Sequence, residues 1–175
     1  MRTIRYSVAM SLDGYIAGPN GESDWIIMDP DIDFRALMSS FDTVLMGRRT
    51  FEAAAAYGGG SMPGMNAVVV SRTLKQDDHP KVTVIGSDLE AEVTRLRDQP
   101  GKDIWLFGGG SLFRSLLDLG LVDAVEVAVI PVLLGAGRPF LLPPGDRASL
   151  RLTNTRVYDK TGIVSLEYAL EARTA

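Results

Sequence analysis

The sequence is most informative at Ile104-Trp105-Leu106-Phe107-Gly108-Gly109-Gly110-Ser111-Leu112-Phe113, where four apolar residues precede three glycines and an amphipathic segment. The apolar residues predict a buried strand, and Leu112, Leu116 and Leu119 recur at helical spacing. Bare backbone N–H groups and the positive end of a helix meet at such a junction, which suits a phosphate or pyrophosphate. The glycines are also typical of a tight turn with close helix packing, because neither the G-x-G-x-x-G pattern nor Gly-Lys-Ser/Thr is present. Both interpretations stay open at this point.

The bulk composition narrows the class of protein. A length of 175 residues fits a single domain spanning residues 1–175. The net charge of −4 and the pI near 5.0 argue against nucleic acid and anionic membranes as partners. There is no cysteine and one histidine, His79, so we expect no metal site and no Ser-His-Asp hydrolase. No signal pattern and no long apolar run are present, and we therefore expect a cytoplasmic protein.

Strand and helix patterns alternate over the first two thirds of the chain. The predicted strands are residues 4–10, 43–46, 67–70, 82–85 and 104–107. The predicted helices are residues 34–41, 50–56, 87–96 and 111–119, the third opened by a capping box at Ser87-Asp88-Leu89-Glu90. Three more strands, 124–132, 150–158 and 163–170, follow without helices between them. This order predicts a three-layer α/β domain with a mainly parallel mixed sheet and an antiparallel tail.

Polar residues cluster after four of the predicted strands. Ligands of open α/β sheets bind beyond the carboxyl ends of the strands, which share one edge. The segments that would meet there are Asp13-Gly14, Gly47-Arg48-Arg49-Thr50, Ser71-Arg72 and Gly108-Gly109-Gly110-Ser111. Four loops on one edge can enclose one elongated ligand, which strengthens the prediction of an anion site.

The arginines suit a phosphorylated ligand. Arg48 and Arg49 open a helix, where the dipole disfavours cations, so an anionic ligand would compensate their charge. Ser71 and Arg72 leave a strand, and together they suit a ribose phosphate and an adenine face. The alternatives are surface ion pairs for Arg48 and Arg49 and an ordinary polar strand exit for Ser71 and Arg72.

Three aspartates, Asp29, Asp31 and Asp33, precede the first helix. They suit helix capping, or else hydrogen bonding and proton relay to an amino-pyrimidine ring. Trp25 and Phe34 nearby are either an aromatic wall of the substrate pocket or plain core.

Two glycine-containing loops leave similar choices. Asp13-Gly14 is typical of a turn, with a ligand role as the alternative. Residues 131–139, with Gly135 and Gly137, are a β-bulge, a substrate loop or a subunit contact. Composition does not separate these three readings.

Five blocks in order resemble the dihydrofolate-reductase-like superfamily, in particular the reductase (RibD C-terminal) domain of riboflavin biosynthesis and its stand-alone relatives. The blocks are Val8-Ala9-Met10-Ser11-Leu12-Asp13-Gly14-Tyr15-Ile16-Ala17, Met46-Gly47-Arg48-Arg49-Thr50-Phe51-Glu52, Val69-Val70-Ser71-Arg72, Trp105-Leu106-Phe107-Gly108-Gly109-Gly110 and Pro131-Val132-Leu133-Leu134-Gly135-Ala136-Gly137. The resemblance implies a three-layer α/β/α dihydrofolate-reductase-like fold with a C-terminal antiparallel hairpin. It also implies NADPH across the strand ends, a homodimer, and hydride transfer to a pyrimidine- or pteridine-like small molecule.

The resemblance also implies roles for individual residues. The cofactor-binding residues would be Gly47, Arg48, Arg49 and Thr50 at the phosphates, Ser71 and Arg72 at the adenosine 2′-phosphate, and Gly108, Gly109, Gly110, Ser111 and Leu112 at the pyrophosphate. The catalytic candidates are Asp33, which would supply or steer a proton, and Asp13, which would shape the loop over the nicotinamide. Met10, Trp25 and Phe34 would line the substrate pocket.

Several activities fit the resemblance. A 5-amino-6-(5-phosphoribosylamino)uracil reductase is the leading expectation. Dihydrofolate reduction and a non-catalytic NADPH- or flavin-binding module are the alternatives. The substrate is open because riboflavin reductases commonly carry lysines where this chain has Ser7 or Val8, and Tyr15.

Overall fold

The computed structural model describes residues 1–56, 62 and 64–171. Its strands are β1 (Ile4–Ser11), β2 (Tyr15–Ala17), β3 (Phe41–Gly47), β4 (Asn66–Val70), β5 (Thr83–Ile85), β6 (Asp103–Gly108), β7 (Ala124–Ile130), β8 (Arg138–Pro139), β9 (Leu150–Tyr158) and β10 (Ile163–Leu170). Its helices are α1 (Phe34–Ser39), α2 (Arg48–Ala56), α3 (Leu89–Asp98) and α4 (Gly110–Asp118), with a short 3-10 turn, η1 (Gln76–Asp78).

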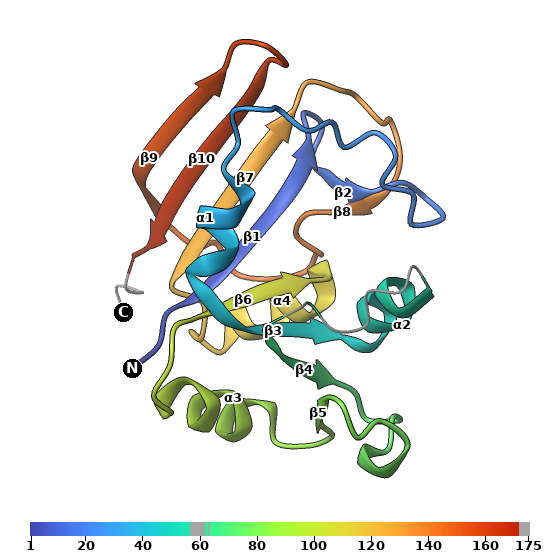
Figure 1. Ribbon diagram of the computed structural model, residues 1–175. Helices are drawn as coiled ribbons and strands as arrows, with labels where there is room; N and C mark the ends of the chain where they lie inside the picture. The colour runs from blue at the N-terminus through green and yellow to red at the C-terminus, as the bar shows by residue number, and fades with distance from the viewer. Residues whose placement is uncertain (57–61, 63, 172–175) are drawn as a thin grey trace.

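An eight-stranded sheet forms the centre of the molecule, in the order β5-β4-β3-β6-β1-β7-β10-β9 (Figure 1). The six neighbouring strands β5, β4, β3, β6, β1 and β7 pair in parallel. By contrast, β10 runs antiparallel to both β7 and β9. A separate ribbon pairs β2 with β8. The predicted mainly parallel mixed sheet with a C-terminal antiparallel hairpin is confirmed.

Apolar residues on both faces of the sheet build the core. Ile104 and Leu106 of β6 pack in one cluster with the apolar faces of α3 and α4. Trp105 of the same strand packs in the opposite cluster with residues of α1 and α2. Successive strand residues point to opposite faces, so an unbroken apolar run requires helices on both sides. The predicted three layers follow from this double burial.

Two local predictions at helix ends were wrong. Phe41 does not extend α1 but begins β3, where it is 3% exposed and stacks on Trp105. The helix ends instead at Ser39, and the amide of its C-cap residue, Ser40, donates to Leu37 O. The N-cap of α3 is Asp88 rather than Ser87, since the Asp88 carboxylate accepts from Ala91 N at 3.3 Å. Serine and aspartate are both favoured as N-cap residues, so the tetrapeptide alone does not decide which of Ser87 and Asp88 is the cap.

The carboxyl ends of the parallel strands meet at one edge, as predicted. There β1 ends at Ser11, β3 at Gly47, β4 at Val70 and β6 at Gly108. At the far end of the sheet, β9 is an edge strand. The homodimer that the resemblance implies stays a prediction. In the part of the chain that the structure describes, no helix has the length and apolar character needed to cross a bilayer.

Candidate functional site

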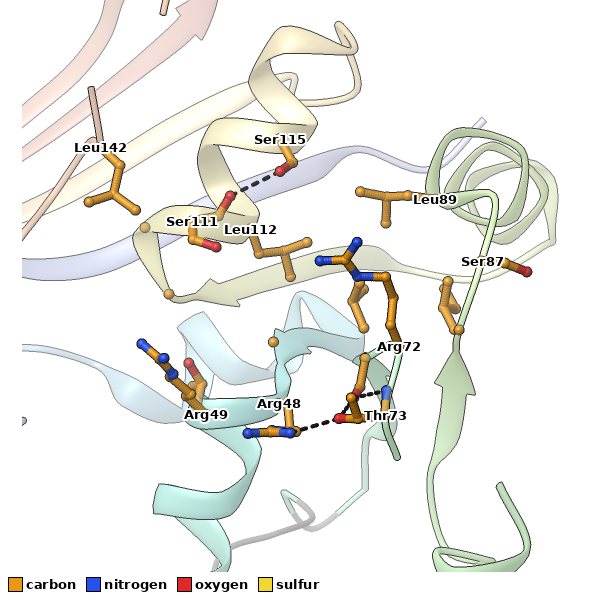
Figure 2. Close-up of a pocket in the computed structure, with 18 of the residues that line it drawn as sticks. Arg48, Arg49, Arg72, Thr73, Ser87, Leu89, Ser111, Leu112, Ser115 and Leu142 are labelled. Atoms are coloured by element: carbon orange, nitrogen blue, oxygen red, sulfur yellow. Dashed lines mark hydrogen bonds between the residues drawn. The ribbon is translucent and has the colours of Figure 1, made fainter. Parts of the chain in front are cut away.

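A pocket of about 840 Å³ opens at this edge, between the ends of β3 and β4 and the start of α4 (Figure 2). Every predicted cofactor-binding residue except Gly108 lines it: Gly47, Arg48, Arg49, Thr50, Ser71, Arg72, Gly109, Gly110, Ser111 and Leu112. Gly108 is the buried last residue of β6. The ends of four parallel strands, β3, β4, β5 and β6, therefore meet at one cavity, as expected from the parallel topology.

The start of α4 offers free backbone donors to the pocket. Gly109 is the N-cap, and its carbonyl oxygen accepts from the amides of Leu112 and Phe113. Within the described residues, the N–H groups of Gly110 and Ser111 have no acceptor. Unpaired N–H groups and the helix dipole favour an anion at this point.

The glycines also allow close packing, so both interpretations of the triplet apply. Gly108 has φ +109°, a conformation that L residues rarely adopt, and the peptide between it and Gly109 is cis. A Cβ added at Gly110 would lie 2.9 Å from the carbonyl oxygen of Pro139, which is backbone. The first turn of α4 thus touches β8 directly.

The arginines of the pocket differ in what they contact. Arg48 donates to Thr73 Oγ1 at 2.7 Å and lies 3.3 Å from Glu52, so the surface-pair alternative describes it. Arg49 and Arg72 have no hydrogen-bond or ion-pair partner among residues 1–56, 62 and 64–171. Figure 2 shows the guanidinium of Arg72 pointing between Leu89 of α3 and Leu112 of α4. Arg72 is therefore free to bind a ligand in the pocket.

Ser71 has a structural task at the exit of β4. Its side chain is 6% exposed, and its hydroxyl accepts from the amides of Thr73 and Leu74 at 3.2 and 3.0 Å. This turn holds Arg72 at the pocket, so Ser71 acts on the site through the backbone. Its predicted contact with a phosphate stays a prediction.

Asp13 lies outside the pocket and joins two loops. Its carboxylate accepts from Ser11 Oγ at 2.7 Å, from Leu134 N at 3.1 Å and from Gly135 N at 2.7 Å. The Ser11 hydroxyl, followed by the two amides, lowers the pKa of Asp13 below its usual range. A carboxylate held in its charged form suits the anchoring of a loop better than proton transfer.

The glycine loop of residues 131–137 leads into β8. A Cβ on Gly137 would lie 2.3 Å from the carbonyl oxygen of Ala17, so this position requires the close approach of two backbones. β8 then pairs with β2 and places Arg138 and Pro139 in the pocket wall. Arg138 and Pro139 thus give the end of this loop a place in the pocket wall, and the choice among a β-bulge, a substrate loop and a subunit contact stays open.

The three aspartates before α1 have separate contacts, and none of them lines the pocket. Asp33 is exposed and caps α1 by accepting from Ala36 N at 2.8 Å. Asp31 pairs with Lys160 at 2.8 Å. Asp29 is 2% exposed and accepts from Thr161 Oγ1 at 2.7 Å. Capping therefore accounts for Asp33, while Asp29 ties this segment to the turn between β9 and β10.

We expect the Asp29 contacts to make the fold sensitive to acid. Burial opposes the charge of Asp29, but the Thr161 hydroxyl, the Asp31 amide and the charges of Lys160 and Arg156 outweigh it and lower its pKa. A lowered pKa stabilises the fold above the ordinary aspartate value, and this contribution is lost as the pH falls through the lowered one. Asp29→Asn should therefore be less stable than the parent at neutral pH, with the two converging in acid.

Urea denaturation measured from neutral to acidic pH would test this expectation. Asp159→Asn is the matched control, because Asp159 is an exposed carboxyl in the same turn. A stability difference between Asp29→Asn and the parent that stays constant with pH would contradict the assignment.

The predicted substrate residues lie elsewhere on the chain. Met10 is partly buried in β1 against the core cluster of α4. Trp25 is half-buried and donates from Nε1 to Glu22 O at 3.1 Å, and Phe34 is 39% exposed. None of the three lines the pocket, so their contact with a substrate stays a prediction.

Sequence reasoning missed several residues of the pocket wall, namely Thr73, Ser87, Asp88, Leu89, Ser115, Arg138 and Leu142. Thr73 lies three residues after the predicted strand 67–70, and Ser87 and Asp88 lie two and three residues after the predicted strand 82–85. The strand-end rule applied to β5 would have found the last two. Arg138 had no such signal, because β8 has two residues and shows no periodicity. Among the described residues, no cluster of three His, Asp or Glu is placed to hold a metal ion.

Comparison with known proteins gives the family. The model of the RibD C-terminal domain matches residues 2–164. The uncharacterized protein YyaP of Bacillus subtilis (strain 168) is 37% identical over 183 residues, which cover 95% of this chain and 94% of YyaP. Both matches extend over nearly the whole chain.

Solved structures share the fold. A Shewanella sp. PV-4 protein, provisionally named for riboflavin biosynthesis, is 25% identical with a TM-score of 0.84 over 98% of this chain and 100% of that one. The Thermotoga maritima diaminohydroxyphosphoribosylaminopyrimidine deaminase/5-amino-6-(5-phosphoribosylamino)uracil reductase is 19% identical, with a TM-score of 0.70 over 97% of this chain and 56% of that one. Dihydrofolate reductase of Enterococcus faecalis, complexed with NADP(H), is 19% identical, with a TM-score of 0.71 over 97% of both chains. The fold is dihydrofolate-reductase-like, and the chain belongs to the RibD C-terminal domain family.

Proposed function

We propose that this protein is an NADPH-dependent reductase that transfers hydride to a pyrimidine- or pteridine-like small molecule. The pocket carries the proposal, because it combines a helix start with free N–H groups and two unpaired arginines among the described residues. Its described lining includes four arginines and one acidic residue, Asp88. The charge of this cavity and its volume of about 840 Å³ suit a dinucleotide with an additional phosphate.

The residues present fit NADPH at two places. The N–H groups of Gly110 and Ser111 would hold the pyrophosphate. Arg72 would hold the 2′-phosphate that distinguishes NADPH from NADH, since its guanidinium has no other partner among the described residues. The bound cofactor would supply the hydride. The protein would then contribute orientation and electrostatics.

For the substrate, we propose a 5-amino-6-ribosylamino-pyrimidine as the first choice and dihydrofolate as the second. The family membership and the name of the Thermotoga maritima relative support this order. Asp33 keeps a proposed role in steering a proton. Its cap uses Oδ1, and Oδ2 has no partner within the described residues.

Ligand titration followed by a turnover assay tests the function. Tryptophan emission or calorimetry should show NADPH binding much tighter than NADH. Consumption of NADPH on addition of 5-amino-6-(5-phosphoribosylamino)uracil would then establish the reductase, and dihydrofolate is the comparison substrate. Binding without oxidation by either substrate would favour the non-catalytic module, and binding of neither nucleotide to folded protein would refute the proposal.

A further inference from the structure

Arg138 lines the pocket but belongs to β8, which lies outside the four segments predicted to meet at the strand ends. Its backbone is held by the pairing of β8 with β2, in which it lies opposite Ala17. The next residue, Pro139, has its carbonyl oxygen 2.9 Å from the position of a Cβ on Gly110. Arg138 is thus fixed beside the first turn of α4, and Figure 2 shows Ser111 of that turn across the pocket from Ser87.

The side chain of Arg138 also touches the segment that follows β2. A Cβ on Gly21, whose φ is +93°, would lie 3.0 Å from Nη2 of Arg138, so the guanidinium packs directly on this glycine. No carboxylate of the described residues lies within ion-pair distance of Arg138. Glu22 is near, but its two carboxylate oxygens already accept from the backbone and side-chain nitrogens of Asn20.

The charge of Arg138 is therefore only partly balanced. The pKa of Glu22 is lowered chiefly by its own backbone amide and by the Asn20 side chain, with the charge of Arg138 as a smaller cause. The positive charge of Arg138 acts on the Glu22 carboxylate, but the two side chains form no hydrogen bond. The guanidinium keeps its donors for a ligand, and a guanidinium forms strong paired hydrogen bonds with phosphate oxygens.

We propose that Arg138 binds the pyrophosphate group at the α4 end of the pocket and links it to the segment of residues 18–25. This inference rests on the proposed function, since it concerns a dinucleotide in the same pocket. The link to the segment arises because the guanidinium lies on Gly21, and Trp25 of the same segment is bonded to Glu22 O. Arg138 is a binding residue in this scheme, and the N–H groups of Gly110 and Ser111 share the same phosphate.

Calorimetry with Arg138→Gln tests the contact. The expected result is a dissociation constant about tenfold higher than that of the parent, both for NADPH and for inorganic pyrophosphate, which is the effect of one hydrogen bond to a charged group. Arg138→Lys keeps the charge and should lose less than the glutamine variant. Arg151→Gln, in the exposed strand β9, is the matched control and should bind both probes like the parent. Equal thermal stability of the variants excludes unfolding as the cause.

The emission of Trp25 tests the link to the segment. Inorganic pyrophosphate does not absorb at the wavelengths of tryptophan fluorescence, so it does not interfere with the measurement. Through the contact of Arg138, saturating pyrophosphate should change the tryptophan emission of the parent, but not that of Arg138→Gln or of Trp25→Phe. Parent-like affinity in Arg138→Gln would overturn the phosphate contact, and an emission change that persists in Arg138→Gln would overturn the link. Failure of the parent to bind NADPH would instead refute the proposed function, so the two failures are distinguishable.

Discussion

Replacing Arg72 by glutamine is expected to raise the dissociation constant of NADPH about tenfold or more and to leave that of NADH nearly unchanged. The two nucleotides differ by the 2′-phosphate, and the free guanidinium of Arg72 points into the pocket (Figure 2). A hydrogen bond to a charged group contributes about 1.5–3 kcal/mol, which corresponds to at least this factor. Calorimetric titration of the parent and the Arg72→Gln variant with both nucleotides measures the difference.

Arg48→Gln is the matched control for this experiment. Its guanidinium is engaged by Thr73 and Glu52, so its loss should weaken NADPH binding less than the loss of Arg72. Equal weakening of NADPH and NADH by Arg72→Gln would show that Arg72 supports the pocket in general and does not read the 2′-phosphate. The selectivity for NADPH would then need another residue.

Gly110→Ala is expected to weaken both the fold and the binding of NADPH. The added Cβ would lie 2.9 Å from Pro139 O and 3.3 Å from Phe140 O, both of which are backbone atoms. Relief of this overlap requires α4 and the β8 segment to separate, and overpacking of this kind costs about 1–3 kcal/mol. The same movement displaces the N–H groups of the first turn, so we expect at least tenfold weaker binding. Urea denaturation and calorimetry measure the two effects.

Ser111→Ala is the control for this second experiment. Ser111 is exposed, and its replacement leaves the backbone N–H groups of the first turn in place. It should bind NADPH nearly as the parent does if the N–H groups hold the pyrophosphate. Strong loss of affinity in Ser111→Ala, with Gly110→Ala unaffected, would assign the binding to the hydroxyl and contradict the role given to the helix start.

The two experiments probe opposite ends of one ligand. Arg72 lies at the exit of β4, and Gly110 follows β6, which is separated from β4 by β3 in the sheet order. Two independent losses would support a dinucleotide that spans the strand ends. An effect confined to one end would instead indicate a smaller phosphorylated ligand.

Local sequence was sufficient to predict the strands wherever burial imposes a regular spacing of apolar residues. The run from Ile104 to Phe107 is apolar at every position, and each residue packs on one side or the other of the sheet. β9 and β10 have the predicted bounds, residues 150–158 and 163–170. The positions of Arg48, Arg49 and Arg72 at the pocket follow from the same rule, because parallel strands must end at one edge.

The contacts of the polar groups could be decided only in three dimensions. Asp13 meets Leu134 across 121 positions of the chain, and Asp29 meets Thr161 across 132. Arg138 reaches the pocket because a two-residue strand pairs with β2 and packs on Gly110. Burial leaves a period in the sequence, since it depends on which face of a strand or helix each residue occupies. A hydrogen bond between distant loops leaves no such period, and it forms where the complete sheet brings the two strand ends together.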